Sequence, residues 1–401
     1  MPEKSMIQIL AIDDQPLMLN LLQTMLTKLG YDQVTTCSSG QEGLTWLEGV
    51  DETHTIILLD LNMSEMDGIE FIRHLANRHF KGHLLLLSAE DERMRETVHK
   101  LIKNYKIASL GHLHKPVILE LLSSKLGKWR SPQPKRVIIN KKHYSADELR
   151  AAIANHEFIN YYQPKVDIKS AKVVGVESLV RWHHPADGIV FPDQFIAIAE
   201  DHELIDDLTR TVIKAAFTQT KSWQDAGLTL QVAINISMSN LTDLNFANYL
   251  VNTAADSGIS PSDIVLEVTE SKLMTHTAIS MEVLTRLRMH RFSLSIDDFG
   301  TGHSSLSQLC NIPFNELKID QSFVHNTINN ETQQAIFNAS LGLAKQLGMK
   351  SIAEGVEDQA DWDFIRSTDC DIAQGYFIAK PMPAHDIFSW IINWEATANR
   401  L

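Results

Sequence analysis

Short apolar runs alternate with helix-like patterns along the first part of the 401-residue chain. The runs are continuous and too short for helices, which indicates strands that are buried on both faces of a parallel sheet. Segments with apolar residues at helical spacing, 16–29 and 68–77, lie between them. This order predicts an α/β domain with a doubly wound parallel sheet over residues 1–127. The expected strands include 6–12, 55–59 and 83–87.

A change in composition follows this first domain. Residues 121–146 contain seven Lys or Arg and no Asp or Glu, and Pro132 and Pro134 lie in the middle. This composition is typical of a solvated connector, which we favour over a basic patch that binds a ligand. We therefore expect a basic linker over 128–145 and a second domain over 146–401.

A second alternation of strand-like and helical patterns fills the rest of the chain, with helices expected near 208–224 and 332–347. Roughly 255 residues of such repeat, with polar residues where successive strands end, predict a (β/α)₈ barrel with one active-site mouth. A short turn at 168–171 joins two runs as in a hairpin, which leaves open that one strand runs antiparallel. The polar residues expected at the mouth are Glu177, Asn235, Glu267, Asp297, Asp298, Lys318, Glu354 and Gln374.

Composition restricts the class of protein. The net charge of −14 argues against a DNA-binding surface, and no basic recognition helix follows the first domain. The three cysteines, Cys37, Cys310 and Cys370, have neither disulfide nor zinc spacing, which fits a reducing compartment. The N-terminus has no signal-peptide layout, and no apolar run approaches the ~18 residues of a membrane span. We expect a cytoplasmic protein that binds neither DNA nor membrane.

Carboxylates and a lysine follow the expected strands of the first domain. They are Asp13, Asp14, Asp60 and Lys115, together with the hydroxyl of Ser88. Ligands of a doubly wound sheet bind beyond the carboxyl ends of the strands, and gathered carboxylates need a hard cation such as Mg²⁺. The lysine would neutralise an incoming phosphoryl group, and the serine would hydrogen-bond to it. A merely acidic surface is the alternative, which five positions in the right order disfavour.

These positions resemble the receiver domains of two-component response regulators over residues 6–126. The motifs are the Asp-Asp pair, DLNMSEMDG from Asp60, Ser88-Ala and Lys115-Pro. The resemblance implies a flavodoxin-like fold, phosphorylation of Asp60 by a cognate histidine kinase, and sensing of the phosphate by Ser88 and Lys115. It also implies one Mg²⁺ or Mn²⁺ held by Asp14, Asp60 and the Asn62 carbonyl, with Asp13 contributing through water. Two positions depart from the family: Ser64 replaces a proline, and His112 replaces the aromatic switch residue.

The expected mouth of the barrel gathers five carboxylates and two amides, and this density of negative charge requires cations. Two Mg²⁺ or Mn²⁺ ions about 3.5–4 Å apart would clamp a phosphodiester and stabilise the leaving oxygen. Asn235 would add a neutral oxygen ligand, which hard metals accept. Lys318 would position the attacking water or stabilise charge on the phosphorus.

Longer motifs of the second domain resemble the EAL family of cyclic di-GMP phosphodiesterases over nearly all of residues 146–401. The motif that names the family reads ESL here, at 177–179, so that Ser178 stands in place of alanine. The others are INIS around Asn235, LEVTES around Glu267 and Glu270, DDFGTG at 297–302, ELKID at 316–320, AEGVE at 353–357 and QGYFIAKP at 374–381. In the DDFGTG loop, His303 replaces the usual tyrosine.

The resemblance implies hydrolysis of one phosphodiester of cyclic di-GMP to linear pGpG by a two-metal mechanism. It assigns Glu177, Asn235, Glu267 and Asp297 to one metal, and Asp297 and Asp298 to the second. It makes Glu354 a metal-site carboxylate or general base, and it lets Lys318 and Gln374 order the catalytic water. Gln163, Leu179, Arg181 and Asp320 would contact the dinucleotide, Glu270 would brace the DDFGTG loop, and the chain would form a homodimer or larger assembly.

Phosphorylation of Asp60 would modulate the barrel, in a direction that the sequence does not give. An alternative is a catalytically silent receptor that holds cyclic di-GMP and signals by protein–protein contact. Such members usually lack a metal ligand or the naming glutamate, and this chain has the whole set, so we favour the enzyme.

Overall fold

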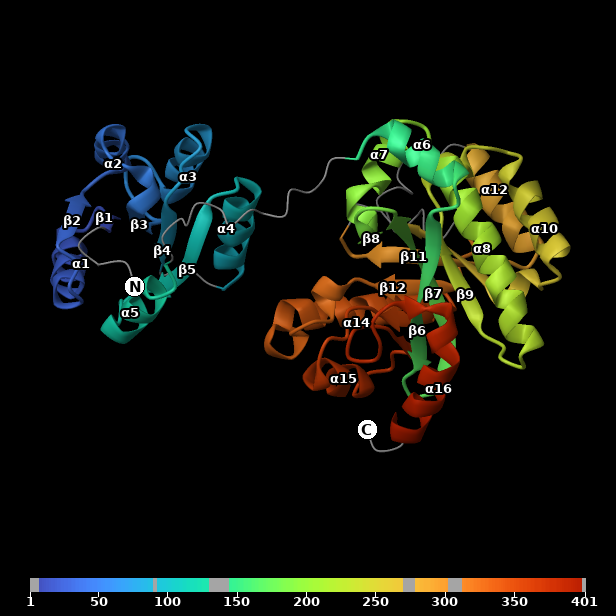
Figure 1. The fold of residues 1–401 in the computed structure, drawn as a ribbon. Coiled ribbons are helices and arrows are strands. Elements are labelled where there is room, and N and C mark those ends of the chain that lie inside the picture. Colours follow the sequence, from blue (N-terminus) through green and yellow to red (C-terminus); the bar gives the residue numbers. More distant parts are fainter. Residues whose placement is uncertain (1–6, 89–91, 130–143, 270–277, 302–311, 399–401) are drawn as a thin grey trace. The chain divides into compact units, whose positions relative to one another are not determined.

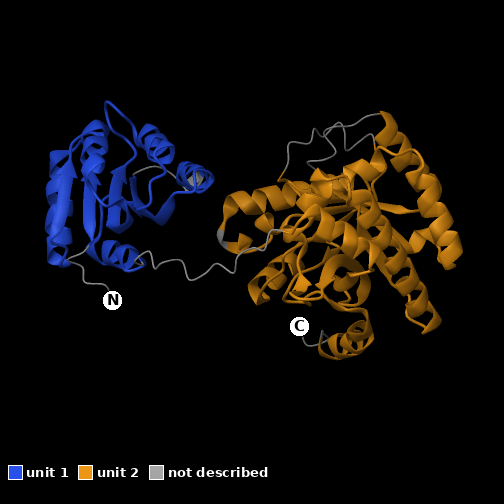
Figure 2. Ribbon diagram, turned by 45° about the horizontal axis from the view of Figure 1, so that its top comes forward, with its two compact units in different colours: residues 1–139 blue, residues 140–401 orange. Residues whose placement is uncertain are grey.

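The computed structural model describes residues 7–88, 92–129, 144–269, 278–301 and 312–398. The chain divides into two compact units, residues 1–139 and 140–401 (Figure 2). Most of the expected linker, 128–145, lies outside the described residues. Among the described residues, no helix combines the length and the apolar character that a membrane span needs.

The first unit is a doubly wound α/β fold, as the apolar runs predicted. Its parallel sheet has the order β2-β1-β3-β4-β5 (Figure 1). The strands are β1 (Gln8–Ile12), β2 (Gln33–Cys37), β3 (Thr55–Asp60), β4 (His83–Ser88) and β5 (Ala108–His114). The helices are α1 (Pro16–Lys28), α2 (Gly40–Trp46), α3 (Gly68–Asn77), α4 (Glu92–Asn104) and α5 (Leu119–Leu126).

The strands of this sheet are apolar on both faces because helices cover both. Ile9 and Ala11 of β1 pack in one cluster with side chains of α1 and α5. Leu10 and Ile12, which point the other way, pack with side chains of α2, α3 and α4. Each fully buried leucine or isoleucine contributes roughly 1.5–3 kcal/mol relative to an exposed one. This burial fixes the sheet and places the carboxyl ends of β1, β3 and β4 along one edge.

The second unit is a closed barrel of eight strands among the described residues, in the order β6-β14-β13-β12-β11-β10-β9-β7, with β7 pairing back to β6. Strand β6 runs antiparallel to both of its neighbours, so the hairpin expected from the turn at 168–171 is present. The barrel strands are β6 (Phe158–Asp167), β7 (Val173–His184), β9 (Gln231–Asn235), β10 (Ile264–Thr269), β11 (Ser293–Phe299), β12 (Glu316–Ile319), β13 (Lys350–Ala353) and β14 (Ile372–Ala373). The short strands β8 (Gly188–Val190) and β15 (Met382–Pro383) pair with β7 and β6.

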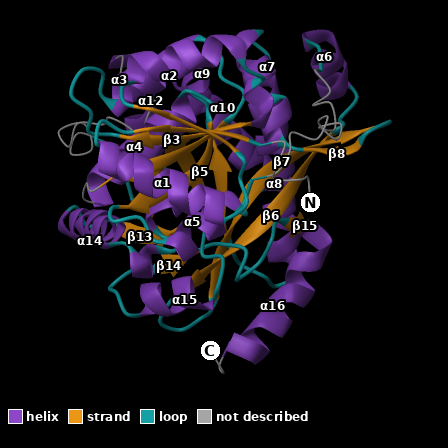
Figure 3. Ribbon diagram, turned by 90° about the vertical axis from the view of Figure 1, so that its left-hand side faces the viewer, coloured by secondary structure: helices purple, strands orange, loops and turns teal. Residues whose placement is uncertain are grey.

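Helices pack against the barrel strands: α14 contacts β12 and β13, and α16 contacts β6, beside which it lies in Figure 3. Each presents an apolar face; α8, for example, buries Leu208, Val212, Ala216 and Trp223 along one side. The helices are α6 (Ala146–Ala154), α7 (Ile196–Asp201), α8 (Ile205–Asp225), α9 (Met238–Leu241), α10 (Phe246–Ser257), α12 (Ala278–Met289), α14 (Glu331–Gln346), α15 (Gln359–Arg366) and α16 (Ala384–Ala398).

Several barrel strands extend further than the sequence predicted, and two of these differences shape the mouth. Strand β10 continues two residues beyond Glu267. Glu267 therefore lies within the strand and not after it, and its side chain is fully buried inside the barrel. Strand β11 continues through the Asp-Asp pair to Phe299, with a register shift against β12 between Ile296 and Phe299. Such an irregularity re-aims side chains, and Asp298 adopts a left-handed φ of 57° there.

Candidate functional site

A buried ammonium group occupies the centre of the barrel mouth. Lys318 extends from β12 and is 1% exposed. Its Nζ atom lies 2.8 Å from Asp297 Oδ1 and 2.8 Å from Glu354 Oε1. It also lies 3.0 Å from Glu267 Oε2 and 3.7 Å from Glu177 Oε2. The lysine thus joins carboxylates from β7, β10, β11 and the end of β13.

The charge of Lys318 is secured by these neighbours. Burial by itself would lower the pKa of a lysine, but the attraction of Glu177, Glu267, Glu354 and Asp297 outweighs it. The pKa of Lys318 therefore lies well above its usual value. Lys318 is a permanent cation in a site where charge interactions are stronger than in water.

Two amide side chains hold both oxygens of Glu177. Asn235 Nδ2 donates to Glu177 Oε1 over 2.8 Å, and Gln374 Nε2 donates to Oε2 over 2.7 Å. Gln374 Nε2 also donates to Gln163 Oε1 over 3.0 Å, and Gln163 Nε2 donates to the Ala379 carbonyl. Burial and the nearby Glu267 raise the pKa of Glu177 to about 7, in spite of Lys318.

A second buried lysine, which the sequence analysis did not single out, completes this charge network. Lys165 Nζ lies 3.0 Å from Glu267 Oε1, on the side of that carboxylate that Lys318 does not contact. Burial would raise the pKa of Glu267, but Lys165 and Lys318 lower it to about 2. Lys165 lies two residues after Gln163 on β6, so the two-residue period of a strand could have placed it inside the barrel.

Three carboxylates of the mouth are close enough to share a cation. Oxygen atoms of Asp297, Asp298 and Glu354 all lie within 4.8 Å of one another. Burial and the charges of Asp297 and Asp320 raise the pKa of Asp298 to about 6. Burial likewise raises the pKa of Glu354 well above its usual range. An oxygen-only donor set whose members repel one another fits a hard divalent cation, which would relieve that repulsion.

A cavity of about 440 Å³ opens beside these groups. Its wall includes most of the expected site residues from β6, β7 and the strand ends, and several to which the sequence analysis gave no role in the site. The expected ones are Gln163, Glu177, Leu179, Asp298, Asp320, Glu354 and Gln374. The additional ones are Gln321, Gly355, Glu357, Gly375 and Tyr376.

Arg181 has other contacts. Its guanidinium lies 5.0 Å from the ring centre of Phe191 and 5.6 Å from that of Tyr161, and it donates to the Val180 carbonyl. Two other expected residues of this site, Glu270 and His303, lie outside the described residues.

A histidine–aspartate pair lies behind one wall of the cavity. His325 Nδ1 lies 2.8 Å from Asp361 Oδ2, and Nε2 lies 3.7 Å from Glu357 Oε2. The hydrogen bond to Asp361 and the charges of Asp361, Glu357 and Asp358 raise the pKa of His325 above its usual value. Protonation of His325 therefore stabilises the folded chain.

Substitution His325→Gln is expected to lower the melting temperature at acidic pH and to have little effect at alkaline pH. The raised pKa means that the stabilisation is fully present below about 6.5, the value of an unfolded histidine. It is lost as pH rises through the higher folded-state pKa. Thermal melts of the two proteins from pH 5.5 to 9.5 measure this, and a difference in melting temperature that grows with pH would contradict the expected direction.

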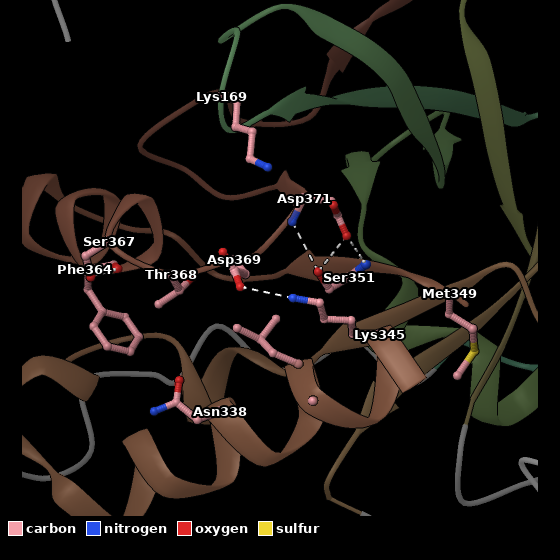
Figure 4. A pocket seen from close by; sticks show the side chains of 12 residues that line it. Lys169, Asn338, Lys345, Met349, Ser351, Phe364, Ser367, Thr368, Asp369 and Asp371 are labelled. Carbon is pink, nitrogen blue, oxygen red and sulfur yellow. Dashed lines mark hydrogen bonds and ion pairs between the residues drawn. The ribbon is translucent and has the colours of Figure 1, made fainter. Parts of the chain in front are cut away.

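A second, larger hollow of about 840 Å³ lies at the opposite ends of the barrel strands (Figure 4). Polar groups in its wall pair with one another. Ser351 Oγ donates to Asp371 Oδ2 over 2.9 Å, and Lys345 Nζ lies 3.3 Å from Asp369 Oδ2 (Figure 4). None of the residues expected at the active site lines it.

The first unit carries its own acidic site, with oxygen atoms of Asp13, Asp14 and Asp60 all within 4.8 Å of one another. Lys115 Nζ lies 2.7 Å from Asp13 Oδ2 and 2.7 Å from Asp60 Oδ2. Burial raises the pKa of Asp60, against the pull of Lys115. The carbonyl of Ser88, at the end of β4, accepts from the backbone N–H of Lys115. The donor set fits one hard cation beside Asp60.

The departure at position 64 has a structural consequence. The backbone N–H of Ser64 donates to Asp14 Oδ2 over 3.0 Å. A proline there would have no N–H to donate, so serine allows the loop after β3 to hold Asp14. Asn62 is exposed in the same loop, and His112 is exposed on β5.

These features define a class of protein in which a receiver-like sheet precedes a barrel with an acidic mouth. A sequence model of the response regulator receiver domain matches residues 9–126, and one of the EAL domain matches residues 146–381. The chain belongs to the EAL domain family and carries a response regulator receiver domain before the barrel.

Relatives with known names match either nearly the whole chain or about 60% of it. The chain is 32% identical over 381 residues to the cyclic di-GMP phosphodiesterase RocR of Pseudomonas aeruginosa, covering 94% of this chain and 96% of RocR. A solved complex of the MucR phosphodiesterase with cyclic di-GMP is 35% identical with a TM-score of 0.58, covering 60% of this chain and 98% of that one. An EAL domain protein of Listeria monocytogenes is 30% identical with a TM-score of 0.55, covering 61% of this chain and 97% of that one.

Proposed function

We propose that this chain is a response regulator whose barrel hydrolyses cyclic di-GMP to linear pGpG. The observation that carries the proposal is the complete set of carboxylates and amides around Lys318, which opens onto a cavity of about 440 Å³. Similarity to RocR over both domains supports the same activity. We take residues 1–127 as the receiver, 128–145 as the linker and 146–401 as the enzyme.

We propose places for two cations in the barrel. Glu177, Asn235, Glu267 and Asp297 would hold one, and Asp297 and Asp298, together with Glu354, the other. Asn235 donates a hydrogen bond from Nδ2 to Glu177, so its Oδ1 can serve as a metal ligand. When bound, Mg²⁺ or Mn²⁺ would polarise the phosphodiester and lower the pKa of the attacking water.

The protein groups supply orientation, charge and a proton acceptor. Lys318 stabilises the negative charge that develops on the phosphoryl oxygens, because its own charge is fixed before the reaction starts. Glu354 is held at Oε1 by Lys318 and takes the proton of the attacking water at Oε2. Gln374 donates to Glu177, and Gln163 donates to the Ala379 carbonyl, so both amides are held in place to orient the reactants. Leu179, Arg181 and Asp320 contact the dinucleotide.

The test is incubation of purified protein with cyclic di-GMP and Mg²⁺ or Mn²⁺, followed by chromatography of the nucleotides. We expect pGpG to form, and a chelator to prevent it. Cyclic di-GMP that stays intact in every arm but binds measurably would overturn the enzyme in favour of the receptor. Light scattering of the same sample tests the homodimer or larger assembly that we propose.

Phosphorylation of the receiver is the proposed input. Asp60, 3% exposed and paired with Lys115, is the acceptor for a cognate histidine kinase, with one Mg²⁺ or Mn²⁺ held beside Asp14 and the Asn62 carbonyl. Asp13 assists through water, and Ser88 and Lys115 bind the transferred phosphate. The resulting change at the receiver would alter turnover in the barrel.

Substitution Asp60→Asn is expected to abolish labelling by acetyl phosphate, because the amide cannot form an acyl phosphate. Intact-mass spectrometry with Mg²⁺ measures this as the loss of one added phosphoryl group. Comparison of turnover with and without acetyl phosphate then gives the sign of regulation in the wild type, and the variant should show no response. Labelling that persists in Asp60→Asn would place the acceptor elsewhere.

A further inference from the structure

A buried carboxylate outside the cavity links two loops of the active site. Asp361 lies in the first turn of α15, and its side chain is 2% exposed. Its Oδ1 accepts the backbone N–H of Asn326 over 3.0 Å. Its Oδ2 accepts the backbone N–H of Glu357 over 3.0 Å and lies 2.8 Å from His325 Nδ1.

The two backbone donors belong to different loops. Asn326 lies on the segment that leaves β12, which carries Asp320 and Gln321 into the wall of the cavity. Glu357 lies on the segment that leaves β13, which carries Glu354 and Gly355 into the same wall. The Asp361 side chain thus joins two loops, the one that follows Lys318 on β12 and the one after β13 that contains Glu354.

We infer that Asp361, with His325, is a positioning residue for the phosphodiesterase site, which sets the spacing of the β12 and β13 loops across the cavity. The inference rests on the proposed function for its kinetic consequence, but not for its structural one. Asp361 itself is absent from the cavity wall and does not contact the carboxylates around Lys318, so it acts through the loops.

The geometry requires a carboxylate. Both oxygens accept backbone N–H groups in a buried place where water does not replace a lost partner. An asparagine offers one acceptor and one NH₂ group, so whichever way it turns, one loop loses its hydrogen bond. Asn326 adopts a left-handed φ of 59°, and its backbone N–H is one of the two donors to Asp361.

The experiment compares Asp361→Asn with a control that lowers stability in the same helix. Ile365→Val removes one methyl group from a fully buried side chain of α15 and leaves all three contacts of Asp361 in place. A third variant, His325→Gln, removes the cationic partner but keeps both backbone bonds. Hydrogen exchange of the full-length proteins is measured by mass spectrometry without nucleotide, and kcat and KM for cyclic di-GMP are measured with Mg²⁺.

We expect Asp361→Asn to raise exchange at least tenfold in peptides that cover 320–327 and 354–358, and to lower kcat at least tenfold. Ile365→Val should leave both the exchange of these peptides and kcat unchanged. His325→Gln should raise exchange in the same peptides and lower kcat, but by less than Asp361→Asn. Unchanged exchange in both loops of a folded Asp361→Asn protein would overturn the inference. An inactive wild type whose loops still loosen in Asp361→Asn would instead contradict the proposed function and leave the positioning role intact.

Discussion

Substitution Lys318→Met is expected to lower the free energy of unfolding of the metal-free protein by about 3–5 kcal/mol and to abolish hydrolysis of cyclic di-GMP. The ammonium group lies within 3.0 Å of oxygens of Glu267, Asp297 and Glu354, in a place where water does not replace it. Its removal leaves buried carboxylates that repel one another. Urea denaturation in the presence of a chelator measures the loss of stability.

Divalent cations should restore part of this stability, because they would compensate the same carboxylates. We therefore expect Mn²⁺ to raise the melting temperature of Lys318→Met more than that of the wild type. Lys345→Met is the matched control, since Lys345 pairs with Asp369 while both side chains are more than three-quarters exposed. Such exposed pairs contribute about 0–1 kcal/mol. A Lys318→Met protein no less stable than Lys345→Met would contradict the central role of Lys318.

Substitution Glu177→Gln is expected to lower kcat for cyclic di-GMP at least about a hundredfold, the usual effect of removing one preorganised charge-stabilising group. Both oxygens of Glu177 accept hydrogen bonds, from Asn235 and Gln374. The NH₂ group of a glutamine would face one of these donors and displace it. The same change removes one negative charge from the proposed metal site. Steady-state turnover with saturating Mn²⁺ measures the loss, and circular dichroism checks the fold.

Glu316→Gln provides the control for this prediction. Glu316 is also a buried carboxylate on a barrel strand, and burial raises its pKa. Its Oε2 has no hydrogen-bond partner among the described residues, and it is not part of the cavity wall. We expect Glu316→Gln to keep most of the wild-type turnover. Equal losses in the two variants would mean that buried charge in general, and not the position of Glu177, sets the rate.

The sequence predicted those parts of the fold that burial makes regular. Strands β1, β3 and β4 are buried on both faces, so they appear as continuous apolar runs that need no tertiary context. Strands β2 and β5 were not predicted, because they lie at the two edges of the sheet and bury only one residue in β2 and two in β5. The hairpin of β6 and β7 was predicted from its short turn, which is a local feature.

The positions of the site residues followed from the same regularity. Parallel strands end at one rim, so polar residues after Ile234, Ile296 and Ala353 could be expected to meet. The structure brings Asn235, Asp297 and Glu354 into the same network, as that argument requires. Periodicity and strand ends are properties of the chain alone, and they were enough to place the mouth of the barrel.

The sequence by itself thus determined the two domains' fold class and the set of chemical groups at the mouth. The tertiary structure decided how these groups share charge: which oxygen of Glu267 faces Lys165 and which faces Lys318, and how Asp361 joins two loops. These contacts link residues as far as 102 positions apart in the chain. Such pairings depend on strand register and on the bulge at Asp298, and neither leaves a local pattern from which distance or orientation could be read.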